Sequence, residues 1–295
     1  MKVLVTGASG FIGRALVARL LADGCTVDAW DRLRGPDAPG LHRSAVDLAG
    51  SAPLPAPEGG PWDAAFHLAA DSVPGGAWTH HAVIGNLTMT ARVIDHLSRH
   101  APGCRTIVAS SGLVYAPGAK PHDEASPLGP TRPYGLSKQL CEDWALSARE
   151  RLQVMIVRPF NQIGPGMAPG LLVPDVFERV ARGDATLGMQ GRDDWKDFLD
   201  WRDAMQAYSL LLRVDAPSGS VWNLCSGRPV RVSSLVRCIL AECGVEREIR
   251  FADPAVESVL GDPSKLAAAT GWKPKHELHE TVRAICAHQG HSPAP

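Results

Sequence analysis

Three glycines near the N-terminus constrain the fold of this chain more than any other feature of its sequence. Gly7, Gly10 and Gly13 stand in the segment GASGFIG, which follows a short β-type run at residues 2–5 and precedes a helical pattern at residues 14–23. Gly7 permits a tight turn, Gly10 lets main-chain amides approach a pyrophosphate, and Gly13 lets the helix pack closely on the strand. The N-terminus of the helix then offers partial positive charge to phosphates. The pattern predicts a dinucleotide site whose first contacts are Gly7, Gly10, Phe11, Ile12 and Gly13.

The following two thirds of the chain alternate between apolar strand patterns and helical patterns. Such alternation is typical of a parallel sheet with helices on both of its faces. We therefore predict an α/β fold, a Rossmann-type doubly wound parallel sheet. The strands are predicted at residues 2–5, 26–30, 64–68, 105–109, 154–158 and 220–225, and a helix at about 137–151 follows the fourth of them.

The alternation changes near residues 164–166, where the sequence Gly-Pro-Gly interrupts it. The segment that follows leaves the sheet, and the chain after about residue 233 is mostly helical. We predict a smaller, discontinuous C-terminal α/β substrate domain beside the NAD(P)-binding domain. The substrate domain is assigned residues of about 164–195 and 233–295, and the Rossmann domain residues 1–163 and about 196–232.

Composition excludes several classes of function. The 295 residues are 45% hydrophobic, which suffices for a large core, and their formal net charge is −1. This balance gives no general attraction to nucleic acid or to an anionic membrane. No apolar run is long enough to span a bilayer, and the N-terminus lacks the features of a signal peptide. The 7 cysteines form no CxxC pair, so we expect reduced thiols in a cytoplasmic protein and no metal site.

Further cofactor contacts are expected where later strands end. Asp31 ends the second predicted strand, where its carboxylate can accept hydrogen bonds from both adenosine ribose hydroxyls, which favours NAD. Arg32 follows it and can instead bind a 2′-phosphate, so NADP stays open. Asp47 and Leu48 follow the next β-like segment and can flank the adenine, although an ordinary loop fits nearly as well. The strand at residues 64–68 is expected to contact the cofactor at its end through Leu68, Ala69 and Ala70, because the small alanines let the main chain approach it.

Tyr134 and Lys138 form a YxxxK pair at the start of a predicted helix. The i, i+4 spacing places both side chains on one face of that helix. A tyrosine ordinarily titrates near pH 10, and a nearby ammonium lowers its pKa. Lys138 can also hold the nicotinamide ribose. Ser111 lies at the end of a predicted strand, where its hydroxyl can hydrogen-bond a substrate oxygen that gains or loses a proton.

A series of motifs makes the chain similar to the extended short-chain dehydrogenases/reductases, the family of sugar-nucleotide epimerases, dehydratases and reductases. The motifs span nearly the whole chain in the family's order. They are VTGASGFIG at 5–13, HLAA at 67–70, Asn86, SSGLVY at 110–115, YGLSK at 134–138, RPFNQIGPG at 158–166, DFLDWRD at 197–203, NLCSG at 223–227 and GDPSKLAAATGWKP at 261–274.

The resemblance implies a role for each matching position. Tyr134 would be the general acid/base, Lys138 would tune it and bind ribose, and Ser111 would occupy the catalytic Ser/Thr position. Asn161 matches an asparagine that contacts the substrate diphosphate, and Val173 lies where such enzymes hold the nucleotide base. The resemblance also implies a homodimer formed through two helices, one of which bears Tyr134. The cofactor contacts that it adds are Asn86, Tyr134, Lys138 and Pro159.

The same resemblance separates the reactions within the family. Dehydratases usually carry an acidic residue two positions before the tyrosine of the VY motif, often with another just ahead. Those positions are Leu113 and Gly112 here, so dehydration is disfavoured. SSGLVY, RPFNQIGPGM and NLCSGR most resemble GDP-4-keto-6-deoxy-mannose reductases. We expect hydride transfer to a 4-keto sugar with Tyr134 as the general acid, and a nucleotide-sugar 4-epimerase is the alternative.

Two departures from the family bear on the substrate. The usual Arg-Asp-Phe/Tyr begins with Lys196 here, which keeps the charge but loses bidentate geometry. The segment DPAVESVL at 253–260 carries no arginine where relatives have one. The substrate could then bear less phosphate than a nucleotide sugar, unless Arg192 or Arg228 replaces that clamp. The substrate contacts that we predict are Ser111, Asn161, Val173, Arg192 and Lys196.

Overall fold

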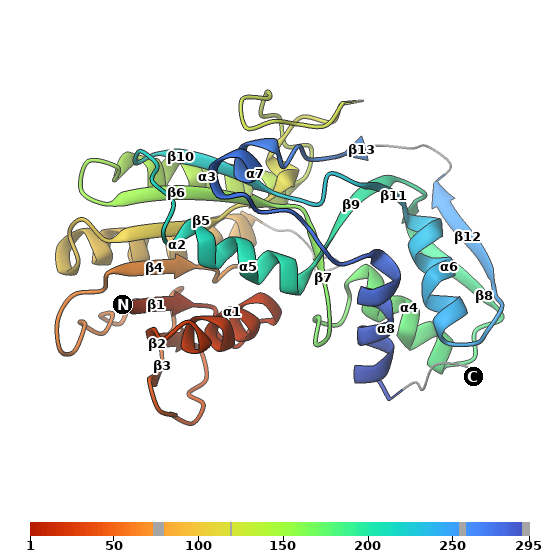
Figure 1. The fold of residues 1–295 in the computed structure, drawn as a ribbon, viewed down its shortest axis with the longest axis horizontal. Helices are drawn as coiled ribbons and strands as arrows, with labels where there is room; N and C mark the ends of the chain where they lie inside the picture. The colour runs from red at the N-terminus through yellow and green to blue at the C-terminus, as the bar shows by residue number, and fades with distance from the viewer. Residues whose placement is uncertain (73–79, 119, 254–257, 291–295) are drawn as a thin grey trace.

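In the computed structural model, residues 1–72, 80–118, 120–253 and 258–290 are described. Within them, seven strands form one sheet in the order β10-β6-β5-β4-β1-β2-β3, and every neighbouring pair is parallel. This confirms the predicted Rossmann-type sheet (Figure 1). The strands are β1 Lys2–Thr6, β2 Thr26–Asp31, β3 Leu41–Ala45, β4 Ala64–His67, β5 Arg105–Ala109, β6 Gln153–Pro159 and β10 Ser220–Leu224.

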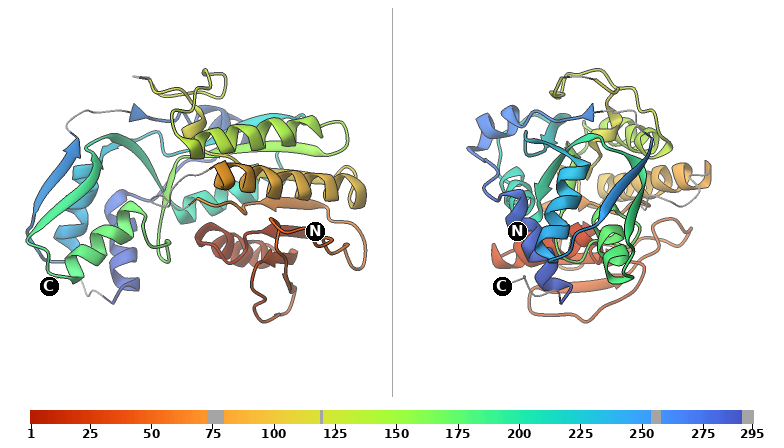
Figure 2. Two further views of the ribbon diagram at one scale, coloured as in Figure 1. Left: turned by 180° about the vertical axis from the view of Figure 1, so that it is seen from behind. Right: turned by 90° about the vertical axis from the view of Figure 1, so that its right-hand side faces the viewer.

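Helices cover both faces of this sheet. Helices α1 (Phe11–Ala22) and α5 (Trp201–Leu211) lie on one face, and α2 (His80–His100) and α3 (Pro133–Ser147) lie side by side on the other (Figure 2). Two of them begin earlier than the sequence pattern suggested, because Gly10 caps α1 and a proline occupies the first turn of α3. A proline loses no hydrogen bond there. The earlier start places Tyr134 and Lys138 in the first two turns of α3.

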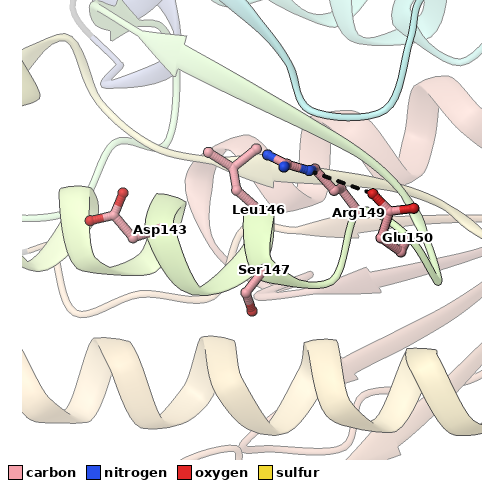
Figure 3. A pocket seen from close by; sticks show the side chains of 5 residues that line it. All are labelled: Asp143, Leu146, Ser147, Arg149 and Glu150. Atoms are coloured by element: carbon pink, nitrogen blue, oxygen red, sulfur yellow. Dashed lines mark ion pairs between the residues drawn. The ribbon is translucent and has the colours of Figure 1, made fainter.

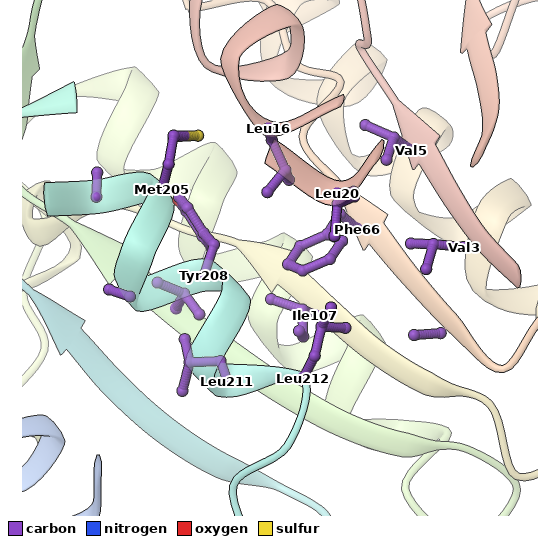
Figure 4. Close-up of a cluster of buried hydrophobic side chains, with 14 of the residues drawn as sticks. Val3, Val5, Leu16, Leu20, Phe66, Ile107, Met205, Tyr208, Leu211 and Leu212 are labelled. Atoms are coloured by element: carbon purple, nitrogen blue, oxygen red, sulfur yellow. The ribbon is translucent and has the colours of Figure 1, made fainter. Parts of the chain in front are cut away.

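The side chains of the buried strands point alternately to two apolar clusters. The register sets Val5 between Ala29 of β2 and Phe66 of β4, and all three belong to the cluster beneath α1 and α5. Figure 4 shows Leu16 and Leu20 of α1 and Tyr208 of α5 packed on this face of the sheet. The opposite cluster includes Leu4, Ile94 and Ile156 and lies beneath α2 and α3. Burial of both faces explains the near-continuous apolar runs of these strands.

Strand order reverses between β1 and β4. From β1 the chain proceeds to β2 and β3 on one side, whereas β4, β5, β6 and β10 follow in turn on the other side. Open parallel sheets bind ligands at the carboxyl ends of the strands on either side of such a reversal. Thr6 and His67, which end β1 and β4, are paired neighbours there. The fold therefore places the glycine turn and residues 68–70 next to each other.

The remaining elements lie beyond the carboxyl edge of the sheet, on the right in Figure 1. Strand β9 (Trp195–Asp200) pairs with β7 (Asn161–Ile163), β11 (Pro229–Arg231) and β13 (Ser258–Val259). Strands β8 (Thr186–Arg192) and β12 (Glu248–Asp253) form a parallel pair. A third apolar cluster joins them to three helices. These helices are α4 Leu172–Ala181, α6 Val232–Glu242 and α8 Leu278–His288.

One later segment returns to the first part of the molecule. Helix α7 (Ser264–Thr270) contacts β10, and Leu266 and Trp272 are buried in the cluster beneath α1 and α5. The division of the chain at about residues 163, 195 and 232 into two domains stays a prediction. None of the helices in the described residues has the length and apolarity that a membrane span requires.

Candidate functional site

The glycine turn between β1 and α1 has no room for a side chain at Gly7 or at Gly13. Gly7 has a φ of +69°, and a Cβ on it would lie 2.8 Å from the main-chain nitrogen of Ala69. A Cβ on Gly13 would lie 2.1 Å from the carbonyl oxygen of Gly7. Ser9 and Gly10 are exposed at the N-terminus of α1. The main chain of the turn is thus open to a ligand, and the turn fits the phosphates of a dinucleotide.

Asp31 lies at the end of β2 and faces this turn. Its Oδ2 accepts a hydrogen bond from the Ser9 amide at 2.8 Å, and its Oδ1 accepts one from the Arg32 amide at 2.8 Å. Burial would raise the pKa of the Asp31 carboxyl, but the bonds from Ser9 and Arg32 outweigh burial and hold that pKa below its ordinary value. A carboxylate therefore persists at neutral pH where the adenosine ribose is expected. Arg32 is exposed beside it.

The other predicted cofactor residues are arranged around the same edge. Ala69 donates its amide to Thr6 Oγ1 at 3.3 Å, which keeps residues 68–70 against the glycine turn. Asp47 is exposed and Leu48 is buried. The carbonyl oxygens of both accept hydrogen bonds from Arg92 Nη1, each at 3.0 Å. These hydrogen bonds hold the loop that contains Asp47 and Leu48 against α2.

Asn86 is buried in α2 and connects two elements. Its Oδ1 accepts the Asp71 amide at 2.7 Å, and its Nδ2 donates to the Asp71 carbonyl at 3.1 Å and to Ser137 Oγ at 3.1 Å. Ser137 precedes Lys138 on α3. The structure thus gives Asn86 a supporting position between the loop after β4 and the helix of the YxxxK pair, and its cofactor contact stays a prediction.

His67 is a core residue at the end of β4, and its side chain is buried. Its ring nitrogens hydrogen-bond Thr6 Oγ1 at 2.8 Å and Thr90 Oγ1 at 3.0 Å. Burial, and then the charge of Lys138, lowers the pKa of His67 to about 3. The imidazole is therefore neutral at physiological pH and is not available as a general acid.

Ser111, Tyr134 and Lys138 converge at the carboxyl end of β5. Tyr134 hydrogen-bonds the side chain of Ser111, and the Ser111 Oγ also accepts the Leu113 amide at 3.1 Å. Lys138 Nζ donates to the Ala109 carbonyl at 2.8 Å and lies 6.0 Å from the centre of the Tyr134 ring. The three predicted catalytic residues, which come from two separate segments, thus form one cluster.

The pKa of Tyr134 differs from the sequence-based expectation. Burial raises the pKa of this phenol above its ordinary value, and the hydrogen bond from Ser111 opposes that effect only in part. Burial also lowers the pKa of Lys138. The ammonium of Lys138 is directed to the carbonyl of Ala109, so it does not stabilise the phenolate directly. Without a bound cofactor, Tyr134 therefore keeps its proton throughout the physiological range.

The predicted substrate residues differ in their exposure and in their partners. Asn161 is exposed on β7 and donates to the Asp197 carbonyl at 2.8 Å. Arg192 forms an ion pair with Asp253 at 2.7 Å. Lys196 Nζ lies 3.9 Å from Asp194 Oδ2. Three of these predicted contacts thus lie on or beside the strands beyond the carboxyl edge of the main sheet.

Val173 is the exception among them. Its side chain is 1% exposed and packs in the third apolar cluster with Val176 and Phe177. Helix α4 thus turns this side chain into the core, and the predicted contact of Val173 with a substrate stays a prediction. Only the main chain of Val173 is left to contact a ligand.

The motif analysis assigned no role to two supporting residues. Arg14, on the first turn of α1, donates to the Ser9 carbonyl at 3.2 Å and to the Gly166 carbonyl at 3.0 Å. It therefore connects the glycine turn with the segment after β7. Asp197 accepts the amides of Ser226 and Gly227 at 2.6 and 2.7 Å. The position of Arg14 directly after the GxxGxxG segment was the available signal for its role. Its partner Gly166 lies far away in the sequence.

The cavity in Figure 3 lies away from this chemistry. It has a volume of about 360 Å³ and is at the last turn of α3. At 1.5 Å per helical residue, Asp143 is about 14 Å along the helix from Tyr134. The residues that line it are Asp143, Leu146, Ser147, Arg149 and Glu150. A second cavity of about 400 Å³, beside Glu124 and Lys265, is also outside the cluster. The arrangement of the motif residues, and not these cavities, therefore defines the candidate site.

Comparison with known proteins gives a family and several relatives. Residues 3–225 match the model of the NAD dependent epimerase/dehydratase family. The chain is 32% identical to the GDP-6-deoxy-D-mannose reductase of Pseudomonas aeruginosa, over 96% of this chain and 95% of the relative. It is 28% identical to a UDP-glucose 4-epimerase of Mycolicibacterium smegmatis, over 96% of each chain.

Solved structures give the same picture. The structure of MoeE5 in complex with UDP-glucuronic acid and NAD superposes with a TM-score of 0.87 at 26% identity, covering 98% of this chain and 99% of that one. The structure of RMD from Pseudomonas aeruginosa complexed with NADPH superposes with a TM-score of 0.82 at 28% identity, covering 97% and 98%. The likeness extends over both parts of the molecule.

Proposed function

Because this chain belongs to the NAD-dependent epimerase/dehydratase family, we propose that it is an NAD(P)-dependent oxidoreductase that reduces the 4-keto group of a nucleotide-linked sugar. The observation that carries the proposal is the convergence of Ser111, Tyr134 and Lys138 beside the glycine turn. Dehydratases of the family usually carry an acidic residue at the position of Leu113, often with another at that of Gly112, and neither residue is acidic here. The reductase and epimerase relatives support the two reactions that remain.

Each residue of the cluster has a task in this reaction. A bound reduced nicotinamide supplies the hydride. Tyr134 donates its proton to the ketone oxygen, and burial of the phenol keeps that proton in place beforehand. Ser111 donates a hydrogen bond to the same oxygen as negative charge develops on it. Lys138 lies one helical turn away on α3, where it would hold the nicotinamide ribose.

Retention of the cofactor distinguishes the reductase from the alternative, a 4-epimerase. An epimerase oxidises and then reduces the same sugar and keeps its nicotinamide, whereas a reductase exchanges it on every turnover. The test is to follow the absorbance of NADH or NADPH with 4-keto sugars linked to GDP, dTDP, UDP and CDP. Net oxidation of the cofactor supports the reductase. Purified protein with stoichiometric bound NAD, which interconverts 4-epimers without net oxidation, would establish the epimerase instead.

The nucleotide part of the substrate depends on the cations beyond the carboxyl edge. Arg192 and Lys196 would face a diphosphate, and both now lie near carboxylates. Arg228 forms an ion pair with Glu277 at 2.7 Å. A bound diphosphate would therefore compete with Asp253, Asp194 and Glu277 for these three cationic side chains. The affinity for each nucleotide sugar can be compared with the affinity for the same sugar without the nucleotide. A difference shows that the nucleotide contributes to binding.

Asp31→Ala is expected to weaken NAD binding by about 10-fold or more, because a hydrogen bond to a charged group contributes about 1.5–3 kcal/mol. Binding of NADP should change less, since Arg32 remains and a 2′-phosphate no longer meets a carboxylate. The dissociation constants of both cofactors can be measured by quenching of tryptophan fluorescence. Asp184→Ala, which removes a surface carboxylate near Arg182, is the matched control. An equal loss for both cofactors would show that Asp31 only shapes the glycine turn.

A homodimer and a cytoplasmic location are part of the same proposal. Helix α3 exposes Leu136, Leu140 and Trp144, with exposures of 45%, 36% and 42%, at i, i+4 and i+8. Ile84 on the neighbouring helix α2 is also exposed. Such an apolar stripe is typical of a protein interface. All seven cysteines lie in the described part of the chain as free thiols, which supports a reducing compartment.

Leu140→Glu is expected to convert the dimer to a monomer, because it places a charge at the centre of the apolar stripe on α3. Sedimentation or light scattering of the purified protein measures the change in mass. Leu33→Glu is the matched control, since Leu33 is exposed on a loop outside this stripe. A wild-type protein that is monomeric at micromolar concentration would contradict the proposed dimer.

A further inference from the structure

A buried ion pair connects α3, the helix that carries Tyr134 and Lys138, with the neighbouring strand β6. Glu142 is on α3, one turn after Lys138, and is 2% exposed. Arg158 is on β6 and is also buried. Arg158 Nε donates to Glu142 Oε1 at 2.9 Å, and Arg158 Nη2 donates to Oε2 at 2.7 Å. This two-bond geometry fixes both the distance and the orientation between the helix and the strand.

The ion pair also contacts the segment after β5 that carries Ser111. Ser110 Oγ donates to Glu142 Oε1, and Ser110 immediately precedes Ser111. On the other side, Arg158 Nη1 donates to Tyr115 Oη at 2.9 Å. Tyr115 follows the short 3₁₀ turn Gly112–Val114 that the Ser111 side chain caps. The pair is therefore bonded to residues on both sides of Ser111.

We propose that the Glu142–Arg158 pair, with Ser110, is a positioning device that sets the distance of Ser111 from Tyr134 and Lys138. The inference rests on the proposed function of those three residues. Glu142 and Tyr134 are two helical turns apart on one helix, so a shift of Glu142 moves the phenol with it. Ser110 is hydrogen-bonded to the same carboxylate and is covalently linked to Ser111, so the position of Glu142 also determines that of Ser111. None of the three positioning residues needs to touch the substrate.

The Glu142 carboxylate also affects the pKa of Lys138. Burial lowers the pKa of Lys138, and the neighbouring Cys141 and Glu142 oppose that effect. The other titratable groups near this ammonium are Tyr134 on its own helix and His67 on β4, and Glu142 is itself paired with Arg158 of β6. His67 is neutral, as shown above, and Arg158 is paired. Removal of the Glu142 charge should therefore lower the pKa of Lys138 further.

Ser110→Ala tests the connection to Ser111 with little risk to folding, because the ion pair itself remains. We expect kcat to fall by about 10-fold, while the KM for cofactor stays within 2-fold. Ser209→Ala is the matched control. Ser209 is also a buried serine, and its Oγ donates at 2.5 Å to Asp23, which forms an ion pair with Arg19. It lies on α5 outside the cluster, so its loss should leave kcat unchanged. Equal kcat values for the two variants would overturn the proposal.

Glu142→Gln tests the electrostatic part and has a readout that a purely structural role does not change. Because Lys138 must be protonated to act, the alkaline limb of the kcat/KM profile should move to lower pH in this variant. The double variant Glu142→Gln/Arg158→Met removes the unpaired buried charge, so it should regain thermal stability without regaining kcat. Recovery of both stability and kcat would show that the pair serves only the fold.

A failure of the proposed function can be recognised separately. It would appear as a wild-type enzyme that turns over none of the 4-keto sugars. The inference is then decided by NMR of the tyrosine rings, because the chain has only 3 tyrosines and a Tyr134→Phe variant identifies the Tyr134 signal. Ser110→Ala should shift that signal, and Ser209→Ala should not. Superimposable Tyr134 signals in wild type and Ser110→Ala would refute the positioning role.

Discussion

Replacement of Tyr134 by Phe is expected to lower kcat for ketone reduction by about 100- to 10,000-fold, the usual contribution of a positioned general acid. The ring and its packing remain, and only the proton that the ketone oxygen receives is lost. Ser111 still offers a hydrogen bond, so a residual rate above that of the free solution reaction should persist. Steady-state oxidation of NADH or NADPH measures the loss.

Cofactor affinity is the control for that variant. Lys138 remains on α3, donates to the Ala109 carbonyl and is free to hold the ribose, so the dissociation constant of the cofactor should change by no more than about 3-fold, or 0.6 kcal/mol. The thermal midpoint should also be preserved, because the phenol ring stays. A Tyr134→Phe enzyme with a kcat within 10-fold of wild type would show that another group delivers the proton.

Gly13→Ala is expected to produce the second large effect, on cofactor binding. Its Cβ would lie 2.1 Å from the Gly7 carbonyl oxygen, a contact that only a displacement of the main chain can relieve. Overpacking of this kind costs about 1–3 kcal/mol, and the displaced atoms are those that would bind phosphate. We expect the dissociation constants of NAD and NADP to rise together by at least about 10-fold, the equivalent of 1.4 kcal/mol. Calorimetric titration can measure both.

Gly85→Ala is the matched control, because Gly85 is also a helical glycine but has no atom within 4 Å of a Cβ built on it. Alanine is favoured over glycine within a helix by about 0.5–1 kcal/mol, so this variant should be slightly more stable and bind cofactor normally. Unchanged cofactor binding in Gly13→Ala would indicate that the turn does not hold the phosphates.

Several features of the fold could be predicted because local sequence controls them. The glycine turn depends on positive φ at Gly7 and on close approach at Gly13, and both requirements select glycine regardless of the distant sequence. The strand patterns reflect burial on both faces of the sheet. The i, i+4 spacing of Tyr134 and Lys138 is itself a helical property. These signals sufficed for the sheet, the cofactor turn and the helix of the YxxxK pair.

Other features depend on residues that are distant in the sequence. Val173 lies in a helix whose buried face is chosen by its packing partners on α6 and α8, so its orientation cannot be inferred from a motif. The expected lowering of the pKa of Tyr134 was wrong because burial, which depends on the whole fold, exceeds the effect of the hydrogen bond from Ser111, and the Lys138 ammonium is directed to the Ala109 carbonyl. Asn86 likewise has partners on two other segments.

The YxxxK pair and the glycine turn were determined by the sequence alone, since each of them requires particular residues at a short, regular spacing. Only the tertiary structure decided that Ser111 meets Tyr134, and that Glu142, Arg158 and Ser110 lie behind them as one buried group. The reason is physical. Desolvation and ion pairing depend on which segments the sheet brings together, and strand order, unlike helical spacing, is not contained in any short stretch of the chain.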